Sequence, residues 1–345
     1  MTATARPTSP RPTTAPRPRT FDEALAALGR PFPSDAAEAA RHYRRLARLL
    51  HPDTAPAGRA EEAEAAFVRL TDQWRRHTGD GAVLTTARGT YPLGRVLATG
   101  DLAVLRGAGP DTVLKIPRRP ADNDLMEREA HALTRLHTVA DARHRAYAPR
   151  LVESFRHRGP DGTERRVNAL QRLRGFHTLA EVRALHPGGL DPRDAAWMWR
   201  RLLVALGWAH RAGIVHGAVL PEHVLIHPAK HGLVLVDWCW STERGTTVPA
   251  LVERHRALYP PEVTGRRPAT EATDIHLASR CVEQLIGDRA PKPLRAFLRG
   301  CTLPAEARRP HDAWRLLAEL DEALERLYGP RAFRPFTMPG TRTHT

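Results

Sequence analysis

The sequence predicts a two-domain protein, in which a small all-helical unit precedes an α+β domain with a sheet-containing lobe and a larger helical lobe. Three observations lead to this fold class. The chain has 345 residues, which is enough for two domains of ordinary size. Its hydrophobic pattern has helical periodicity up to about residue 79 and strand-like alternation after about residue 90. In the second part strands come first and helices follow, which favours an α+β architecture.

Composition sets the expected domain boundaries. The first twenty residues are rich in proline, threonine and arginine and contain no apolar core, so we expect a disordered tail and no secretory signal there. The expected segments are a tail at 1–20, a helical domain at 21–79, a linker at 80–90, an α+β domain at 91–328 and a C-terminal tail at 329–345.

The first domain is expected to be a helical hairpin. A short helix in "FDEALAALGRPF" ends at a Gly-Arg-Pro stop. From Ala36 to Leu50 an apolar stripe alternates with arginines that face outward. The segment "HPDTAPAGRA" interrupts this pattern because proline and glycine exclude a continuous helix. A second helix in "EEAEAAFVRLTDQWRRHTG" is acidic at its start and basic at its end, as the helix dipole favours, and completes an antiparallel hairpin with a basic first arm.

The second domain is expected to begin with strands and to continue with helices. Strands are predicted in "YPLGRVLATGDLAVLRG", "DTVLKIP", "RLVESFRH" and "RRVNALQRL", with a helix in "DLMEREAHALTRLH" after the second of these segments. A long helix in "DPRDAAWMWRRLLVALGWAHRAG" starts with proline and stops at glycine. A short strand pair, "HVLIH" and "LVLVDW", follows, and the remainder is helical apart from loops.

Charge and cysteine usage limit the classes of partner. The formal net charge of +15 favours anionic partners in general, although an arginine-rich bias can equally reflect coding composition. The three cysteines, Cys239, Cys281 and Cys301, are far apart and form no C-x-x-C pair, so we expect no zinc site or disulfide, which fits a reducing cytoplasm. No apolar stretch approaches the roughly 18 residues of a membrane span, so we expect no membrane partner.

A basic helix followed by a His-Pro-Asp tripeptide forms the first candidate site. In "YRRLARLLHPD" the tripeptide lies in the turn between the two expected helices, with "ALAALG" before it and "AFVRLTDQW" after it. On these features the stretch from Phe21 to about Gly79 resembles the J domain of DnaJ-like co-chaperones. The alternative is a structural helix hairpin with a solvated basic face.

The J-domain resemblance implies a partner, a heat-shock ATPase chaperone of the DnaK type whose ATP hydrolysis the domain would stimulate. A positive face would steer an acidic partner, and proline would fix the turn that makes the specific contact. The residues implied are Arg44, Arg45, Arg48, His51, Pro52 and Asp53. The zinc-finger repeats and Gly/Phe-rich segment of full co-chaperones are absent from the sequence, and any protein client is unknown.

The second candidate site is a series of short motifs in a fixed order. Lys115 ends the strand in "TVLKIP", Glu129 stands on the next helix, and "LVLVDW" brings Asp237 after the loop "GIVHGAVLPEHVLI". Further along the chain come "YPPE" at Tyr259–Glu262, Asp274 in "ATDIHLAS" and Arg309 in "AEARRP". Together, over about residues 91 to 325, these motifs resemble the protein kinase fold.

The kinase resemblance implies ATP with Mg²⁺ as cofactor. A lysine–glutamate pair orients the nucleotide phosphates in kinases, and an aspartate after the strand pair holds the metal. The nucleotide-binding residues implied are Gly100, Lys115, Glu129, Gln171 and Asp237, with Asp237 as the Mg²⁺ ligand. Asp274 would anchor the catalytic loop from below, and Arg309 would pair with Glu262.

Three positions of the catalytic loop depart from the kinase pattern. Ala218 replaces the aspartate that orients the substrate hydroxyl, a role worth on the order of 10²–10⁴ in rate. Leu220 replaces the lysine that neutralises the transferring phosphoryl group, and His223 replaces the asparagine that binds a metal. Only Gly100 remains of the three loop glycines. We therefore expect a pseudokinase that holds a nucleotide without transferring phosphate.

Two alternatives stay open. An active serine/threonine or small-molecule kinase with an atypical loop would need a replacement carboxylate near Ala218, or His223 acting as base or metal ligand. A nucleic-acid-binding protein would account for the positive charge, but the sequence has no recognisable reading motif and no aromatic–basic interleaving, so we expect no nucleic-acid partner.

Overall fold

The structure is a computed structural model that describes residues 18–33, 35–78, 82–159 and 161–339. The chain divides into two compact units. The first comprises Met1–Val83 with Pro92–Thr99, and the second comprises Leu84–Tyr91 with Gly100–Thr345. Most of the expected N-terminal tail, the start of the expected linker and the last six residues of the expected C-terminal tail lie outside the described residues.

The first unit contains helices packed around one apolar core. Its helices are α1 (Phe21–Ala27), α2 (Ala36–Leu49), the 3₁₀ turn η1 (Pro52–Thr54) and α3 (Ala60–Thr78). Leu46 and Leu50 pack with Ala63 and Leu70 of α3, and residues of α1 complete the core. Asp35 accepts a hydrogen bond from the backbone N–H of Glu38 at 2.7 Å, which fixes the start of α2.

Helix α2 presents its basic face to solvent. Leu46 is buried, whereas the arginines of this helix are exposed, as the hydrophobic periodicity predicts. The exposed arginines are Arg41, Arg44, Arg45 and Arg48.

Three short strands follow in the chain: β1 (Val83–Thr85), β2 (Thr90–Pro92) and β3 (Val96–Thr99). β1 and the first residue of β2 fall in the segment that the sequence analysis assigned to a linker. Strands of three residues carry too little alternation to be distinguished from a loop by pattern.

The smaller lobe of the second unit contains an antiparallel sheet. Its strands β4 (Ala103–Gly107), β5 (Thr112–Pro117), β7 (Glu164–Gln171) and β6 (Leu151–Arg158) are neighbours in that order. Helix α4 (Asn123–Thr138) packs against β7 and β6. The register pairs Lys115 of β5 with Asn168 of β7, so both side chains lie on the same face of the sheet.

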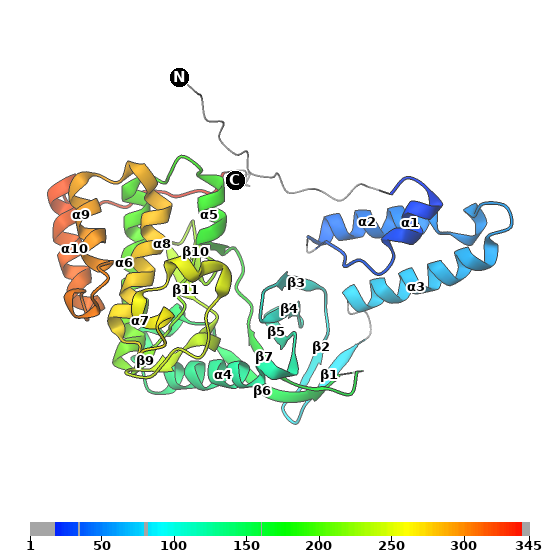
Figure 1. Cartoon of the computed structure of the whole chain (residues 1–345), viewed down its shortest axis with the longest axis horizontal. Coiled ribbons are helices and arrows are strands. Elements are labelled where there is room, and N and C mark those ends of the chain that lie inside the picture. Colours follow the sequence, from blue (N-terminus) through cyan, green and yellow to red (C-terminus); the bar gives the residue numbers. More distant parts are fainter. Residues whose placement is uncertain (1–17, 34, 79–81, 160, 340–345) are drawn as a thin grey trace, which may run out of the picture. The chain divides into compact units, whose positions relative to one another are not determined.

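The larger lobe is helical and, in the described part of the chain, also contains a short three-stranded sheet and a short strand pair (Figure 1). Helix α6 packs against α8 and α10 and carries much of the buried core, including Trp199 and Trp208. The helices are α5 (Leu179–Leu185), α6 (Pro192–Arg211), α7 (Pro261–Thr264), α8 (Glu271–Ile286), α9 (Lys292–Cys301) and α10 (Ala313–Tyr328). The strands are β8 (His177–Thr178), β9 (Ile214–Val215), β10 (Val224–His227), β11 (Gly232–Leu235) and β12 (Thr242–Glu243).

Short 3₁₀ segments connect these elements. They are η2 (Pro120–Asp122), η3 (Ala142–Tyr147), η4 (Trp238–Trp240), η5 (Glu253–Leu258), η6 (Gly287–Arg289) and η7 (Glu306–Arg308). The chain after α10 packs in part on the lobe, because Phe336 and Met338 are buried and Arg334 pairs with Asp194 at 3.1 Å. None of the helices in the described ranges combines the length and apolar character needed to cross a bilayer.

The β10–β11 hairpin positions the candidate site. Its antiparallel register places Val224 opposite Leu235, and Val236 donates its backbone N–H to the carbonyl of His223 at 2.9 Å. This register brings the residues just before β10 beside those just after β11. His223 and Asp237 are therefore neighbours in space.

Candidate functional site

Lys115 is the centre of a buried polar cluster in the second unit. Its Nζ donates to Oε1 of Glu129 on α4 at 2.8 Å and also to Asp237. Burial alone would lower the pKa of Lys115, but the negative charges of Asp237 and Glu129 hold this pKa well above its ordinary value. The sequence-predicted lysine–glutamate pair is therefore formed.

Asn168 fixes the second oxygen of Glu129. Its Nδ2 donates to Glu129 Oε2 at 2.9 Å, and its side chain is fully buried. The sequence analysis did not single out Asn168. The sequence feature that could have indicated it is a lone amide in the otherwise apolar strand segment "VNAL", because a buried polar side chain needs a hydrogen-bond partner.

Asp237 lies two residues after the end of β11 in a left-handed backbone conformation, with φ 66° and ψ 50°. Aspartate is one of the few residues that adopt this region readily. Oδ1 accepts from Lys115, and Oδ2 lies 3.0 Å from Nε2 of His223. Burial would raise the pKa of Asp237, but the two cationic neighbours hold this pKa well below its ordinary value.

His223 has an acceptor at each ring nitrogen. Nδ1 lies 2.8 Å from the carbonyl oxygen of Ala218, and Nε2 faces the carboxylate of Asp237. A neutral imidazole has only one N–H, so it would turn a lone pair towards one of these oxygens. Burial lowers the pKa of His223, but the charge of Asp237 outweighs burial and raises it. The geometry therefore favours an imidazolium.

Asp274 of α8 anchors the loop that precedes His223, as the sequence analysis predicts. Its carboxylate accepts the backbone N–H groups of His216 at 2.8 Å and Gly217 at 2.9 Å. His216 donates from Nε2 to the carbonyl of Val236 at 2.9 Å. Nδ1 of His216 accepts the N–H of Ala218 at 3.3 Å, so this histidine is satisfied as the neutral form. Burial lowers the pKa of His216 to about 4.

The predicted pair of Arg309 with Glu262 is also formed. Nη2 of Arg309 lies 2.7 Å from Oε2 of Glu262, and both side chains are buried. Thr273 donates its hydroxyl to the other oxygen of Glu262 at 3.0 Å. The "YPPE" segment is thus fixed to α8 and to the chain before α10.

Ala218 and Leu220 are fully buried, so neither position offers a functional group to a substrate. Glu222, the carboxylate nearest to Ala218 in sequence, lies 2.9 Å from Nε2 of His255 and 3.8 Å from Nε of Arg254. Among the described residues, this loop therefore contains no unpaired carboxylate that is close to Ala218 in sequence.

Gly100 and Gln171 lie outside the cluster of Lys115 in the described part of the chain. Gly100 is exposed and donates its N–H to the carbonyl of Ala103 at 2.9 Å. A Cβ at Gly100 would meet only that carbonyl oxygen, at an ordinary 3.6 Å. Gln171 is exposed at the end of β7, and its N–H donates to the carbonyl of Arg150 at 2.9 Å. The structure thus leaves both nucleotide-binding assignments as predictions.

The His-Pro-Asp tripeptide lies in the first unit, between α2 and α3. His51 caps η1, and its Nδ1 accepts the N–H of Asp53 at 3.2 Å. The ring of His51 packs edge-on against Phe67, and its side chain remains 45% exposed. Asp53 is 86% exposed. Both side chains are therefore accessible to a partner.

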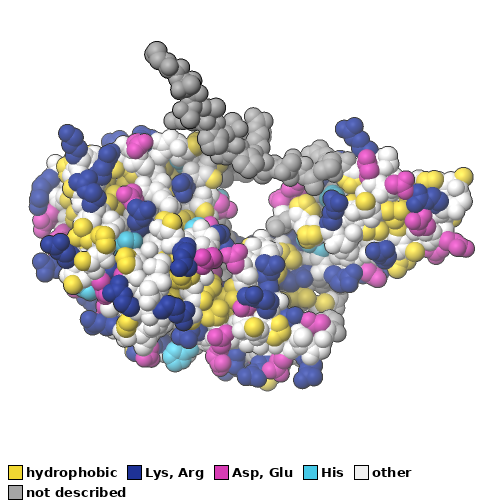
Figure 2. All heavy atoms as spheres, in the orientation of Figure 1, with side chains coloured by type: hydrophobic (Ala, Val, Ile, Leu, Met, Phe, Trp, Pro, Cys, Tyr) yellow, Lys and Arg dark blue, Asp and Glu magenta, His cyan; other side chains and the backbone are white. Residues whose placement is uncertain are grey.

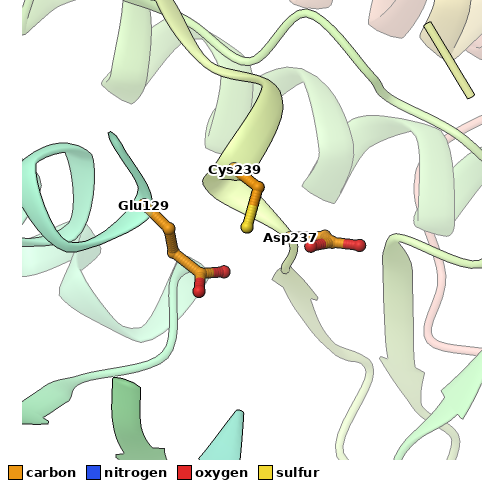
Figure 3. A group of neighbouring side chains, drawn as sticks. All are labelled: Glu129, Asp237 and Cys239. Atoms are coloured by element: carbon orange, nitrogen blue, oxygen red, sulfur yellow. The ribbon is translucent and has the colours of Figure 1, made fainter. Parts of the chain in front are cut away.

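The ammonium of Lys115 contacts three potential metal ligands in the described part of the chain. Ligand atoms of Glu129, Asp237 and Cys239 lie within 4.8 Å of one another (Figure 3). The ammonium of Lys115 already contacts all three, including Sγ of Cys239 at 3.1 Å. Burial raises the pKa of Cys239 well above its ordinary value, so this group is a neutral thiol. Mg²⁺ takes oxygen ligands, so the thiol is not a candidate ligand, and the assignment of Asp237 as the Mg²⁺ ligand stays a prediction.

The comparison with curated proteins gives a partial similarity. The chain is 38% identical over 58 residues to casein kinase II subunit alpha' of Saccharomyces cerevisiae, and the match spans 17% of this chain and 17% of that protein. No protein-family model matches the chain. The partial match and the two-lobed α+β architecture of the second unit both fit a kinase-like domain.

Proposed function

We propose that the chain is a cytoplasmic adaptor in which a J domain recruits and stimulates a DnaK-type chaperone, and a kinase-like domain binds a nucleotide without transferring phosphate. The geometry of the catalytic loop supports the second part of this proposal, which is nucleotide binding without phosphate transfer. The base position is a buried alanine at 218, and His223 is engaged with Asp237 at 3.0 Å. A kinase needs a carboxylate near the substrate hydroxyl and metal-held phosphates.

The nucleotide-binding half of the proposal is supported by the pair of Lys115 with Glu129. The pair is buried and has a distance of 2.8 Å. In kinases a lysine held by a glutamate in this way orients the nucleotide phosphates. The ligand class that fits is a nucleoside polyphosphate such as ATP.

The chaperone half is supported by the accessible tripeptide and the exposed arginines of α2. Arg44, Arg45 and Arg48 share the exposed face of one helix, next to His51 in the chain. A positive face of this kind raises the rate of encounter with an acidic partner. On the face that Figure 2 shows, the basic side chains of the second unit are interspersed with acidic and apolar ones.

The nucleotide half is tested by melting the full chain with and without ATP and by following transfer of labelled phosphate to a generic protein substrate. The proposal predicts a higher Tm with ATP and no transfer above a boiled control. Transfer would show that the chain is an active kinase with an atypical loop. An unchanged Tm, together with no binding by calorimetry, would remove the nucleotide from the proposal.

The chaperone half is tested with the full chain and a purified DnaK-type ATPase. His51→Gln is expected to lose stimulation of ATP hydrolysis while keeping the helical content of the protein, because His51 lies in an exposed turn. His42→Gln on α2 is the matched control and should keep stimulation. Equal stimulation by the His51 variant and the parent protein would refute the J-domain assignment.

A further inference from the structure

A cavity of about 590 Å³ lies between α4 and the segment 241–247, which follows η4. Ile214 of β9 also contributes to its lining, and all of these elements belong to the second unit. The described residues that line it do not include Lys115 or Asp237, so the cavity is separate from the buried polar cluster. Its volume is within the range of about 300–1,000 Å³ that is usual for small-molecule sites.

Three basic side chains of α4 face this cavity. Arg128, His131 and Arg135 are three and four residues apart, so they share one face of the helix. Both arginines are half-buried and bond backbone carbonyls. Nη1 of Arg128 donates to Ser241 at 3.3 Å, and Nε of Arg135 donates to Ala212 at 2.7 Å. Within the described ranges neither guanidinium pairs with a carboxylate.

The guanidinium of Arg128 has spare donors. Of its three nitrogens, only Nη1 has a hydrogen-bond partner among the residues that the structure describes, and Nε is buried without one. Buried donors in folded proteins are nearly always bonded, so this side chain would gain from an acceptor in the cavity. A carboxylate is well suited, because its two oxygens match the planar fork of N–H groups that a guanidinium presents.

Negative side chains line the same cavity. Asp124 of α4 and Glu243 of β12 are exposed, and neither forms an ion pair with another described residue. A third carboxylate, Glu127, is already paired with Arg166 at 3.0 Å. Asp124 and Arg128 are four residues apart, a spacing at which helical ion pairs commonly form, yet they do not pair. Opposite charges therefore line one cavity without contacting each other, which leaves space for a ligand between them.

We propose that this cavity binds a small zwitterion of the amino-acid class. The ligand carboxylate lies against Arg128 and Arg135, and the ligand ammonium faces Asp124 and Glu243. A ligand with only a negative charge would meet the two unpaired carboxylates, and a ligand with only a positive charge would meet the two arginines. A molecule that carries both charges therefore fits this lining best. The site is independent of the proposed nucleotide and chaperone functions.

The first test measures the Tm of the full chain with each of the twenty standard amino acids at millimolar concentration. At least one is expected to raise the Tm and to bind one molecule per chain in calorimetry. The analogues of that compound without the amino group or without the carboxyl group should bind at least tenfold more weakly. The proposal is wrong if no amino acid raises the Tm, or if either analogue binds as tightly as the amino acid.

A variant of the carboxylate side places the binding in this cavity. Arg128→Gln is expected to weaken binding of the amino acid found in the screen at least tenfold. Arg295→Gln on α9 is the matched control, because Arg295 likewise bonds backbone carbonyls, those of Asp288 at 3.3 Å and Ala290 at 3.1 Å. Its Kd should stay within twofold of the parent value. Unchanged binding by a folded Arg128→Gln variant would overturn the site.

A double variant tests the ammonium side. Asp124→Asn combined with Glu243→Gln changes two exposed residues, so the protein is expected to fold. It should lose at least tenfold in affinity for the amino acid and keep, or gain, affinity for the analogue without the amino group. No loss for the amino acid, or an equal loss for both compounds, would overturn the proposal.

Discussion

His223 and Asp237 lie 3.0 Å apart between Nε2 and Oδ2, so a ring nitrogen stands where the kinase pattern expects an amide beside a metal. The contact arises because the β10–β11 register brings His223, just before β10, near Asp237, two residues after β11. The same carboxylate also binds Lys115. This pairing links the altered catalytic loop to the retained lysine and glutamate.

Lys115→Met is expected to destabilise the second unit by about 3–5 kcal/mol, because it leaves Glu129 and Asp237 buried without their shared cation. The measurement is urea unfolding of the full chain. Arg156→Met is the matched control: its pair with Glu164 has a similar distance of 2.8 Å but is largely exposed, and it should cost less than about 1 kcal/mol. Equal effects of the two variants would show that the Lys115 cluster does not stabilise the fold.

Gly217→Ala is expected to destabilise the chain by about 1–3 kcal/mol more than Gly109→Ala. Both glycines have positive φ, 75° and 83°, so both variants incur the same kind of backbone strain. A Cβ at Gly217 would also approach the carbonyl oxygen of Trp240 to 2.7 Å, whereas a Cβ at Gly109 meets nothing within 4 Å. The difference in Tm between the two variants measures the effect of this contact.

The stability of the chain is expected to fall as pH drops below about 6.5. The pKa values of His216 and His276 are both lowered to about 4, chiefly by burial, and the charge of Arg309 is a second cause for His276. Between these values and the ordinary histidine pKa of about 6.5, the unfolded chain binds protons that the folded chain does not. Each histidine then lowers the free energy of unfolding by up to about 1.4 kcal/mol for each pH unit of acidification in this range.

The raised pKa of His223 has the opposite effect: it lowers the stability of the chain as pH rises, and it does so at higher pH. Its stabilisation is fully present below the unfolded pKa and is lost as pH rises through the folded pKa, so it does not offset the loss in acid. Urea unfolding at pH 7, 6 and 5 measures the slope, and His276→Gln should reduce it. A free energy of unfolding that stays constant from pH 6.5 to 5 would contradict the assignment of neutral buried histidines.

Much of the site was predictable from the sequence because its members follow in a fixed order. The pair of Lys115 with Glu129, the anchoring by Asp274 and the pair of Arg309 with Glu262 all depend on motifs that the kinase resemblance supplies. The longer helices and strands were predictable for a similar reason, since each spans enough residues to show a period.

The remaining contacts depend on strand register, which a single sequence does not specify. Asn168 reaches Glu129 only because β7 pairs with β5 in one register, and His223 reaches Asp237 only through the β10–β11 hairpin. Phe336 packs on the lobe from a segment too short and irregular to show a pattern, so the sequence analysis took it for a tail.

The protonation state of His223 tests the central claim most directly. The full chain, labelled with ¹⁵N-histidine, is observed by NMR at pH 7, and the His223 signals are identified by their loss in His223→Asn. The account predicts that both ring nitrogens of His223 carry protons and have imidazolium shifts. A signal from one unprotonated nitrogen would contradict it, because Asp237 would then lack its second cation and one of its oxygens would be available to a metal.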